Sequence, residues 1–332
     1  MPKRATQLHE TDTKSTVESP RVPRGSDKRK PRRLRHFLKL LSVALLFVVL
    51  GGWYAYTHRS QPPSIRKVLF QGVTYMREVR QTPYPLVIHI ARVQLDAEGI
   101  SLLVTPGDAK AKRPLRAQRT SQFLAKHKVQ LAINGDFFFP WWSKTPWDYY
   151  PHVGDPVELE GIAASRGTLY SRGGERWKFP ALYLDQNNVG RFNKIHELKS
   201  FYNIIAGIYM ILEDGAYVSS RKSYYKSDRQ PRTVIALDRT GRQLILCVID
   251  GRQPNYSEGA TIEETAQILL KYGAHDALNL DGGGSTTMVM ESDNGKPVLL
   301  NCPIDNRIPG RERSVANHFG VFAKRLYEMP KP

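Results

Sequence analysis

The sequence predicts an α+β fold, in which a single domain with a mixed β-sheet core and few helices is preceded by one transmembrane helix. Three observations lead to this prediction. An uncharged, mostly apolar run of 18 residues covers 40–57, the length of a membrane-spanning helix. Short apolar runs rich in β-branched residues recur through the rest of the chain, separated by glycine turns. Only 121–128 and the stretch after Thr261 have the spacing of helices.

Charge and composition divide the chain into five parts. Residues 1–39 hold 12 Lys/Arg against 4 Asp/Glu, within a chain of 332 residues and net charge +18. Such a basic, weakly apolar stretch cannot bury enough surface to fold. We therefore expect a disordered cytoplasmic tail over 1–36, a transmembrane signal anchor over 37–57, a linker into the domain over 58–82, a folded domain over 83–326, and a short tail over 327–332.

The flanks of the apolar run predict its orientation. Basic residues crowd 28–35, and Trp53, Tyr54 and Tyr56 form an aromatic belt at the other end. This pattern indicates a cytoplasmic N-terminus, with the domain periplasmic or extracellular. A cleaved signal peptide is the alternative, which the long N-region and the absence of a small-x-small site disfavour. Because the membrane span accounts for the positive charge, nucleic-acid binding is not expected.

The expected strands follow from apolar runs, taken in order along the chain. They cover Leu86–Val93, Leu102–Val104, Val129–Ile133, Val234–Leu237, Gln243–Ile249, Ala277–Leu280, Met288–Met290 and 313–322. The helix after Thr261 begins with a capping box, Thr261 and Glu264, and should stop at Gly273.

The loop after Ala277–Leu280 is the most informative stretch. Asp281 leads into three glycines, Gly282 to Gly284, followed by Ser285 and Thr286. Adjacent glycines are costly in backbone entropy, and they permit positive φ or close approach to a ligand. Their N–H groups and the two hydroxyls would form an anion-binding nest beside a carboxylate. The structural alternative is a tight hairpin loop capped by Asp281.

Two more apolar strands end in polar residues. Gln243–Ile249 leads into Asp250 and Arg252, then a helix, then the strand that ends at Asp281. If these two strands are parallel, their carboxyl ends share one crevice. Val129–Ile133 ends in Asn134-Gly135-Asp136, a candidate for the same crevice or an ordinary Asn-Gly hairpin turn.

Residues 137–150 hold eight aromatic residues in fourteen, interrupted by prolines. Such a loop can be a platform on which sugars stack, a small core of its own, or a contact with the membrane interface. The chain has two cysteines, Cys247 and Cys302, and their spacing does not decide whether they pair.

These motifs together resemble the phosphodiester glycosidase family over roughly 86–324, most strongly over 231–290. The motifs that carry the resemblance are Asn134-Gly135-Asp136-Phe137-Phe138, Pro231-Arg232-Thr233, Val248-Ile249-Asp250-Gly251-Arg252, Ser257-Glu258-Gly259, the stretch 277–286, and 313–317. The resemblance implies cleavage of a sugar C1–O bond in a sugar 1-phosphodiester or a related envelope glycan.

The chemistry of that reaction assigns roles to the residues. The departing phosphate needs charge neutralisation, and a carboxylate supports the cationic sugar. We expect Asp281 to be catalytic, with Asp250 or Glu258 as its partner. The expected substrate-binding residues are Asn134, Asp136, Arg232, Arg252, Gly282, Gly283, Ser285, Thr286 and Asn317. Aspartate-rich loops can hold Ca²⁺, but no ligand spacing here requires it, so no cofactor is expected.

Two other functions fit parts of the sequence. A glycan-binding module would keep the aromatic loop but needs no paired carboxylates. A membrane-anchored factor for polysaccharide export or assembly would act through the tail and the transmembrane helix. Deletion of 1–57 separates an enzyme, which keeps its turnover, from a factor that depends on its tether.

Overall fold

The computed structural model describes residues 32–173, 179–193, 200–218 and 228–326. The chain divides into two units, of which the first ends at Gly52 and the second begins at Trp53. Most of helix α1 (Arg32–Thr57) belongs to the first unit, and the folded domain is the second. The stretch Leu34–Tyr56 is long and apolar enough to cross a membrane, a test that a signal sequence also passes. The predicted tails lie outside the described residues, except for 32–36.

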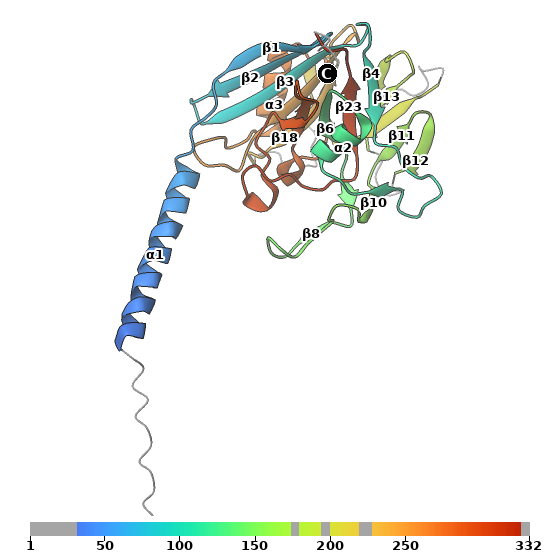
Figure 1. The fold of residues 1–332 in the computed structure, drawn as a ribbon. Coiled ribbons are helices and arrows are strands. Elements are labelled where there is room, and N and C mark those ends of the chain that lie inside the picture. The colour runs from blue at the N-terminus through green and yellow to red at the C-terminus, as the bar shows by residue number, and fades with distance from the viewer. Residues whose placement is uncertain (1–31, 174–178, 194–199, 219–227, 327–332) are drawn as a thin grey trace, which may run out of the picture. The chain divides into compact units, whose positions relative to one another are not determined.

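The domain is mostly β-sheet, and its largest sheet has eight strands (Figure 1). Their order is β1 (Ile65–Phe70), β2 (Val73–Arg80), β3 (Leu86–Gln94), β19 (Gln243–Ile249), β18 (Arg232–Leu237), β20 (Asp276–Asn279), β16 (Tyr209–Glu213) and β17 (Ala216–Tyr217). A second sheet is β22 (Pro297–Leu299), β21 (Met288–Glu291), β6 (Leu131–Asn134), β23 (His318–Phe322) and β4 (Ser101–Val104).

Smaller sheets complete the domain. A five-stranded sheet is β12 (Thr168–Arg172), β11 (Ile162–Ser165), β15 (Asn203–Ala206), β13 (Ala181–Leu184) and β14 (Gly190–Phe192). Three strands are β5 (Leu115–Arg116), β10 (Pro156–Leu159) and β7 (Phe138–Phe139), and a hairpin is β8 (Trp142–Ser143) and β9 (Tyr149–Tyr150). Two short 3-10 turns are η2 (Gly283–Ser285) and η3 (Asp305–Arg307).

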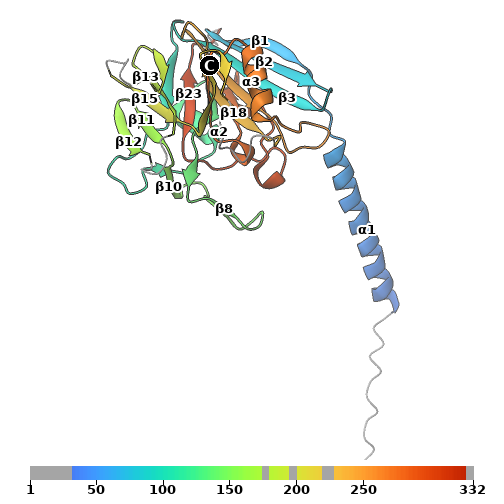
Figure 2. The same cartoon turned by 180° about the vertical axis from the view of Figure 1, so that it is seen from behind.

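The two large sheets pack face to face, and a helix covers each outer face. The continuous apolar run of β19 reflects this burial, because Leu244, Leu246 and Val248 enter the core between the sheets. Ile245, Cys247 and Ile249 point the other way, into the core under α3 (Ile262–Lys271). Helix α2 (Thr120–His127) packs on the far side of the second sheet, so α2 and α3 lie on opposite sides of the domain (Figure 2).

The structure confirms the predicted fold class and most of the predicted elements. Both helices and the predicted strands form, with shifts of a few residues at their ends, and the last strand covers only His318–Phe322 of the predicted 313–322. The capping box closes as predicted: the N–H of Glu264 donates to Thr261 Oγ1, and the N–H of Thr261 donates to Glu264 Oε2. Gly273 follows the helix with φ +83°, as a C-terminal stop requires.

Strand direction decides where the site forms. Strands β19 and β20 both pair antiparallel with β18, which lies between them, so β19 and β20 run parallel to each other. The predicted strand–helix–strand unit therefore exists, with a third strand inserted. Every strand ladder in the described ranges is antiparallel, so the prediction of a mixed sheet was wrong: the parallel strands β19 and β20 are not neighbours, because β18 lies between them.

Candidate active site

The polar ends of three strands meet at one edge of the large sheet. Ile249, the last residue of β19, pairs with Arg232, the first residue of β18. Asn279, the last residue of β20, pairs with Val234. Asp250, Arg232 and Asp281 therefore leave the sheet at the same edge, as the parallel arrangement predicts.

The second sheet delivers its polar residues to the same place. Asn134 ends β6, opposite His318 at the start of β23. Asn134 Nδ2 donates to Asp281 O at 2.6 Å, and the N–H of Asp281 donates to Gly135 O at 3.0 Å. The Asn134-Gly135 turn is thus not a hairpin, because the strands before and after it belong to different sheets. It joins the two sheets at the loop that carries Asp281.

Asn134 and Asn317 hold this junction with their side-chain amides. Asn134 Oδ1 accepts from the Thr233 hydroxyl and from the N–H of Thr287. Asn317 Oδ1 accepts the N–H of Asp136 at 2.7 Å. Both amides are fully buried. Their position gives them a structural task, which is to fix the Asp281 loop and Asp136.

Two buried carboxylates occupy the junction. Asp136 accepts the N–H groups of Phe137 and Gly161, yet burial raises its pKa to about 7, with a contribution from the nearby Asp281. Burial also raises the pKa of Asp281 to about 6, opposed by a hydrogen bond from Ser285 and by the charge of Arg313. Two carboxylates with pKa values near neutrality are typical of acid–base sites.

The glycines after Asp281 make room for two guanidinium groups. A Cβ atom on Gly283 would lie 2.9 Å from Arg252 Nη2, and one on Gly284 would lie 2.8 Å from Arg313 Cζ. Gly283 also has φ +60°, which favours glycine. Two cationic side chains thus lie directly over the glycine loop, within electrostatic reach of Asp281.

Three N–H groups of the predicted anion-binding nest already have backbone partners. The N–H groups of Gly283, Ser285 and Thr286 donate to the carbonyls of Pro231, Gly282 and Gly283. The loop curls into the η2 turn, which uses two of these donors, and the third bonds to the segment before β18. The positive charge at the site therefore comes mainly from side chains. The hydroxyls of Thr286 and Thr287 are buried and have no hydrogen-bond partner within the described part of the chain.

Arg313 is a guanidinium at the site that was not among the predicted site residues, although it begins one of the motifs behind the family resemblance. Its Nε donates to Asp305 Oδ1 at 2.8 Å, and its Nη1 lies 3.4 Å from Ser285 Oγ. Asp305 also pairs with Arg311, at 3.2 Å. Asp305 itself carried no signal in the sequence, because its role depends on η3 packing against η2.

Arg252 and Arg232 occupy different surroundings. Arg252 has φ +59°, and its Nε donates to Gln230 Oε1 at 2.7 Å. Burial lowers the pKa of Arg252, and the charges of Arg313 and Arg307 lower it further. Arg232 is buried, and its Nε and Nη2 donate to the carbonyls of Ala260 and Asp228.

Asp250 lies in a separate buried network. Its carboxylate accepts from Asn301 Nδ2 and from the N–H of Cys302, both at 3.0 Å, and lies 3.2 Å from His89 Nε2. The other ring nitrogen of His89 lies 2.7 Å from the Tyr75 hydroxyl. Asn301 Nδ2 also donates to Thr286 O, which connects this network to the Asp281 loop.

The remaining candidates lie at the rim or away from the site. The Glu258 side chain is 44% exposed, and its Oε2 lies 4.0 Å from Arg229 Nη1. The backbone carbonyl of Glu258 accepts the N–H of Arg252. Cys247 and Cys302 are both free thiols.

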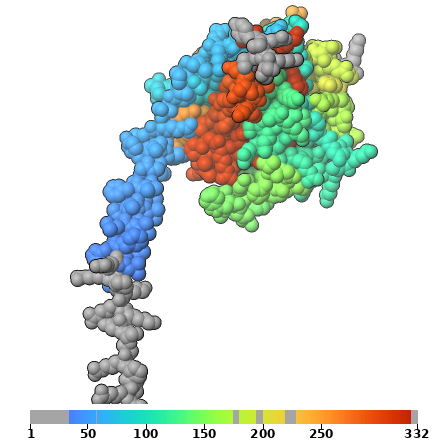
Figure 3. Space-filling view, viewed as in Figure 1, coloured from blue at the N-terminus to red at the C-terminus, as the bar shows by residue number. Residues whose placement is uncertain are grey.

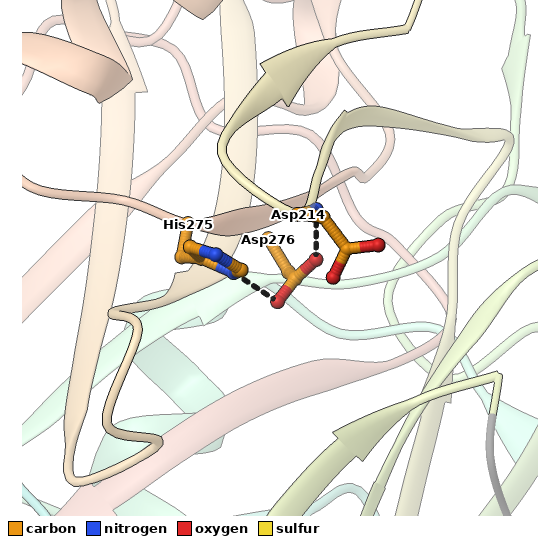
Figure 4. A group of neighbouring side chains, drawn as sticks. All are labelled: Asp214, His275 and Asp276. Atoms are coloured by element: carbon orange, nitrogen blue, oxygen red, sulfur yellow. Dashed lines mark hydrogen bonds and ion pairs between the residues drawn. The ribbon is translucent and has the colours of Figure 1, made fainter.

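One cluster among the described residues has the composition of a metal site: Asp214, His275 and Asp276 (Figure 4). Asp276 begins β20, so this cluster lies at the strand end opposite to the one that leads to Asp281. The carboxylate of Asp276 accepts a hydrogen bond from the N–H of Asp214 and contacts the ring of His275. These contacts hold two turns together, which explains why the three side chains lie close to one another.

The fold and the site define an α+β domain with buried carboxylates beside guanidinium groups, and comparison with known families specifies it. The chain matches the phosphodiester glycosidases over residues 127–322, more than half of its length. It therefore belongs to the phosphodiester glycosidase family, as its motifs predict.

Curated relatives are more distant. The chain is 28% identical over 124 residues to N-acetylglucosamine-1-phosphodiester alpha-N-acetylglucosaminidase of Bos taurus, covering 31% of this chain and 23% of the relative. The Homo sapiens protein of the same name is 29% identical over 124 residues, covering 31% and 24%. The chain thus spans about a quarter of the length of these relatives.

Solved structures share the fold. A hypothetical protein from Synechocystis has a TM-score of 0.55 at 18% identity, over 80% of this chain and 64% of that one. The catalytic domain of the zebrafish N-acetylglucosamine-1-phosphodiester alpha-N-acetylglucosaminidase, auto-inhibited by its pro-peptide, has a TM-score of 0.54 at 20% identity, over 81% and 86%.

Proposed function

We propose that this protein is a hydrolase that cleaves the C1–O bond of a sugar 1-phosphodiester. One observation carries the proposal: Arg252 and Arg313 lie over the glycine loop that begins with the buried Asp281. A phosphodiester leaving group departs as an anion, and two guanidinium groups at fixed positions neutralise that charge. A carboxylate next to them suits the cationic sugar that forms in the same transition state.

The proposed step balances as a hydrolysis. The C1–O bond breaks, and its electron pair leaves with the phosphate oxygen toward Arg252 and Arg313. A water oxygen bonds to C1, and one water proton is released. Asp281 acts in one of two ways: as the base that takes this proton, or as a nucleophile whose bond to C1 forms as the C1–O bond breaks and is then broken by the attacking water. Asp136, whose pKa of about 7 suits proton exchange near neutrality, is its proposed partner and takes the proton in the second case. Asp250, enclosed by Asn301, Cys302 and His89, is proposed to position the loop through Asn301.

The substrate and its location are further parts of the proposal. The curated relatives are named for N-acetylglucosamine 1-phosphodiesters, so this sugar is the first substrate to test. We propose that α1 anchors the protein, with the basic flank in the cytoplasm and the domain facing outward toward envelope sugar phosphates.

A turnover screen tests the proposed activity. The full-length protein in detergent is given methyl phosphodiesters of several sugar 1-phosphates, and release of methyl phosphate is measured. Asp281→Asn is the matched control, because it keeps the shape of the side chain and removes its charge. Release that depends on Asp281 supports the proposal. Tight carbohydrate binding without turnover of any phosphodiester would instead favour a glycan-binding module.

A further inference from the structure

A short segment at the start of the domain lies against a loop of the candidate site. Residues 56–61, here called the entry segment, lead from the end of α1 toward β1. Arg59 Nη1 donates to Gln253 Oε1 at 2.8 Å, and Gln61 Nε2 donates to Tyr256 O at 2.6 Å. The light-blue residues at the start of the domain border orange residues from later in the chain (Figure 3). The entry segment therefore contacts residues 250–258, here called the Arg252 loop.

The Arg252 loop has an unusual backbone conformation. Arg252 and Asn255 both have φ +59°, in the left-handed region that residues other than glycine seldom adopt. Such conformations persist only where the surrounding contacts hold them. The N–H of Arg252 donates to Glu258 O at 3.3 Å, and Gln253 and Ser257 each donate an N–H to the carbonyl of the other, at 3.1 and 2.9 Å. The loop is thus closed on itself, and the position of Arg252 depends on what fixes this loop to the rest of the domain.

Arg59 fixes the loop through the side chain of Gln253. Gln253 is buried, and its Nε2 donates to Cys302 O at 2.9 Å. Its Oε1 accepts from Arg59 Nη1, which also lies 3.0 Å from Cys302 Sγ. The Arg59 guanidinium lies 4.3 Å from the centre of the Tyr256 ring, within the range of a cation–π contact. One cationic side chain thus contacts three residues in and around the loop, and its loss would remove a charged donor from a buried acceptor, which is costly.

We propose that Arg59 is a positioning residue, which acts through Gln253 to hold Arg252 in place for the leaving phosphate. The inference rests on the proposed function. Gln253 follows Arg252 in the chain, so a shift of Gln253 displaces the guanidinium that lies beside Gly283, where an added Cβ would be 2.9 Å from Arg252 Nη2. The entry segment adds a second contact, because the Tyr56 hydroxyl donates to Arg252 O at 3.4 Å. A stretch expected to be a linker therefore supports the site, as groups that bind a substrate require of their surroundings.

Matched substitutions in the full-length protein test the proposal. Arg59→Met removes the charge and keeps the length of the side chain, and Arg66→Met makes the same change on an exposed residue of β1. With a methyl diester of a sugar 1-phosphate, we expect kcat/KM to fall about tenfold in Arg59→Met and to stay at the wild-type value in Arg66→Met. The loss is smaller than the roughly 10²-fold of a 1 Å misplacement, because other hydrogen bonds still hold Arg252. Arg59→Lys should keep most of the activity, since its ammonium group can still donate to Gln253.

A double-mutant cycle separates positioning from general support of the fold. In an Arg252→Ala background, Arg59→Met should cost less than about twofold, because the guanidinium that Arg59 positions is gone. The full tenfold loss in that background would overturn the inference, since Arg59 would then act independently of Arg252. Wild-type kcat/KM in Arg59→Met would overturn it as well. So would turnover above wild type, which would mean that the entry segment restrains the site.

Hydrogen exchange tests the positioning without relying on turnover. The N–H groups of 252–258 should exchange about tenfold faster in Arg59→Met than in the wild type or Arg66→Met, whereas those of β19 should keep their rates. If the wild type hydrolyses no diester, the proposed activity fails and this measurement alone decides the inference. Faster exchange confined to the Arg252 loop supports it. Unchanged exchange in the loop refutes it, and so does faster exchange that extends through β19, because Arg59 would then support the whole fold.

Discussion

Gly284→Ala should inactivate the protein without altering a single charge. A Cβ on Gly284 would lie 2.8 Å from Arg313 Cζ and 3.3 Å from its Nε, and would overlap Nη2. Non-bonded heavy atoms rest about 3.5 Å or more apart, so the guanidinium must retreat by roughly 1 Å. Gly284 does not have positive φ, unlike Gly283, so its backbone accepts alanine without strain.

The expected loss follows from that displacement. Misplacing a catalytic group by about 1 Å costs on the order of 10²-fold, and removing one oxyanion donor costs about 10²–10³-fold, or roughly 2.7–4 kcal/mol. We therefore expect kcat/KM on a sugar 1-phosphodiester to fall by about 10²–10³-fold. The free energy of unfolding should change by about 1 kcal/mol or less, because a flexible side chain absorbs the overlap.

A double-mutant cycle measures whether Arg313 carries the effect. The rates of Gly284→Ala, Arg313→Ala and the double variant are compared, together with their denaturant midpoints. Because both changes remove the same guanidinium contact, Gly284→Ala should cost little in the Arg313→Ala background. Gly282→Ala is the structural contrast, since its Cβ would lie 2.7 Å from the backbone oxygen of Pro231 and should destabilise the fold. Wild-type turnover in Gly284→Ala would refute the placement of Arg313 at the reacting group.

The remaining predictions concern charge, pH and topology. Asp281→Asn should abolish turnover while the domain stays folded, and unfolding of the variant by circular dichroism would instead indicate a structural role. Arg252→Lys should lower kcat/KM on a phosphodiester but spare any activity on an aryl glycoside, because lysine cannot form the two-pronged phosphate contact; equal losses on both would exclude an anion clamp. Because burial raises the pKa of Asp136 to about 7, the folded state holds its proton longer than the unfolded state, and stability falls as pH rises from about 4 to 7. In Asp136→Asn, the decline of Tm over that range should be smaller by several °C, and an unchanged decline would contradict the raised pKa. Protease added to spheroplasts should remove the domain but not the N-terminal tail, and full protection of the domain would contradict the proposed orientation.

The pattern of apolar residues was enough to predict the central strands and the edge where they meet, although β1 and β2 lie within 58–82, which was expected to be a linker into the domain. β19 is uniformly apolar because both of its faces are buried, and that run, its terminal Asp250 and the capping box at Thr261 are all visible in the sequence. The glycines after Asp281 likewise indicated a site, because three adjacent glycines are retained only where backbone geometry or close approach requires them.

Only the tertiary structure decided what those residues contact. The sequence suggested that the glycines offer N–H groups, but three donors of the loop bond to the backbone, two within the turn and one to Pro231, and the glycines instead admit Arg252 and Arg313. The sequence made Asp136 a candidate for the same crevice as Asp281, but it left an ordinary Asn-Gly turn equally open, because the two residues follow strands of different sheets, 145 positions apart. Local sequence patterns report burial and backbone preference within one element, whereas the partner of a side chain depends on how separate sheets pack. The sequence therefore identified the family and the strand ends, and the packing of the two sheets decided which charges face one another.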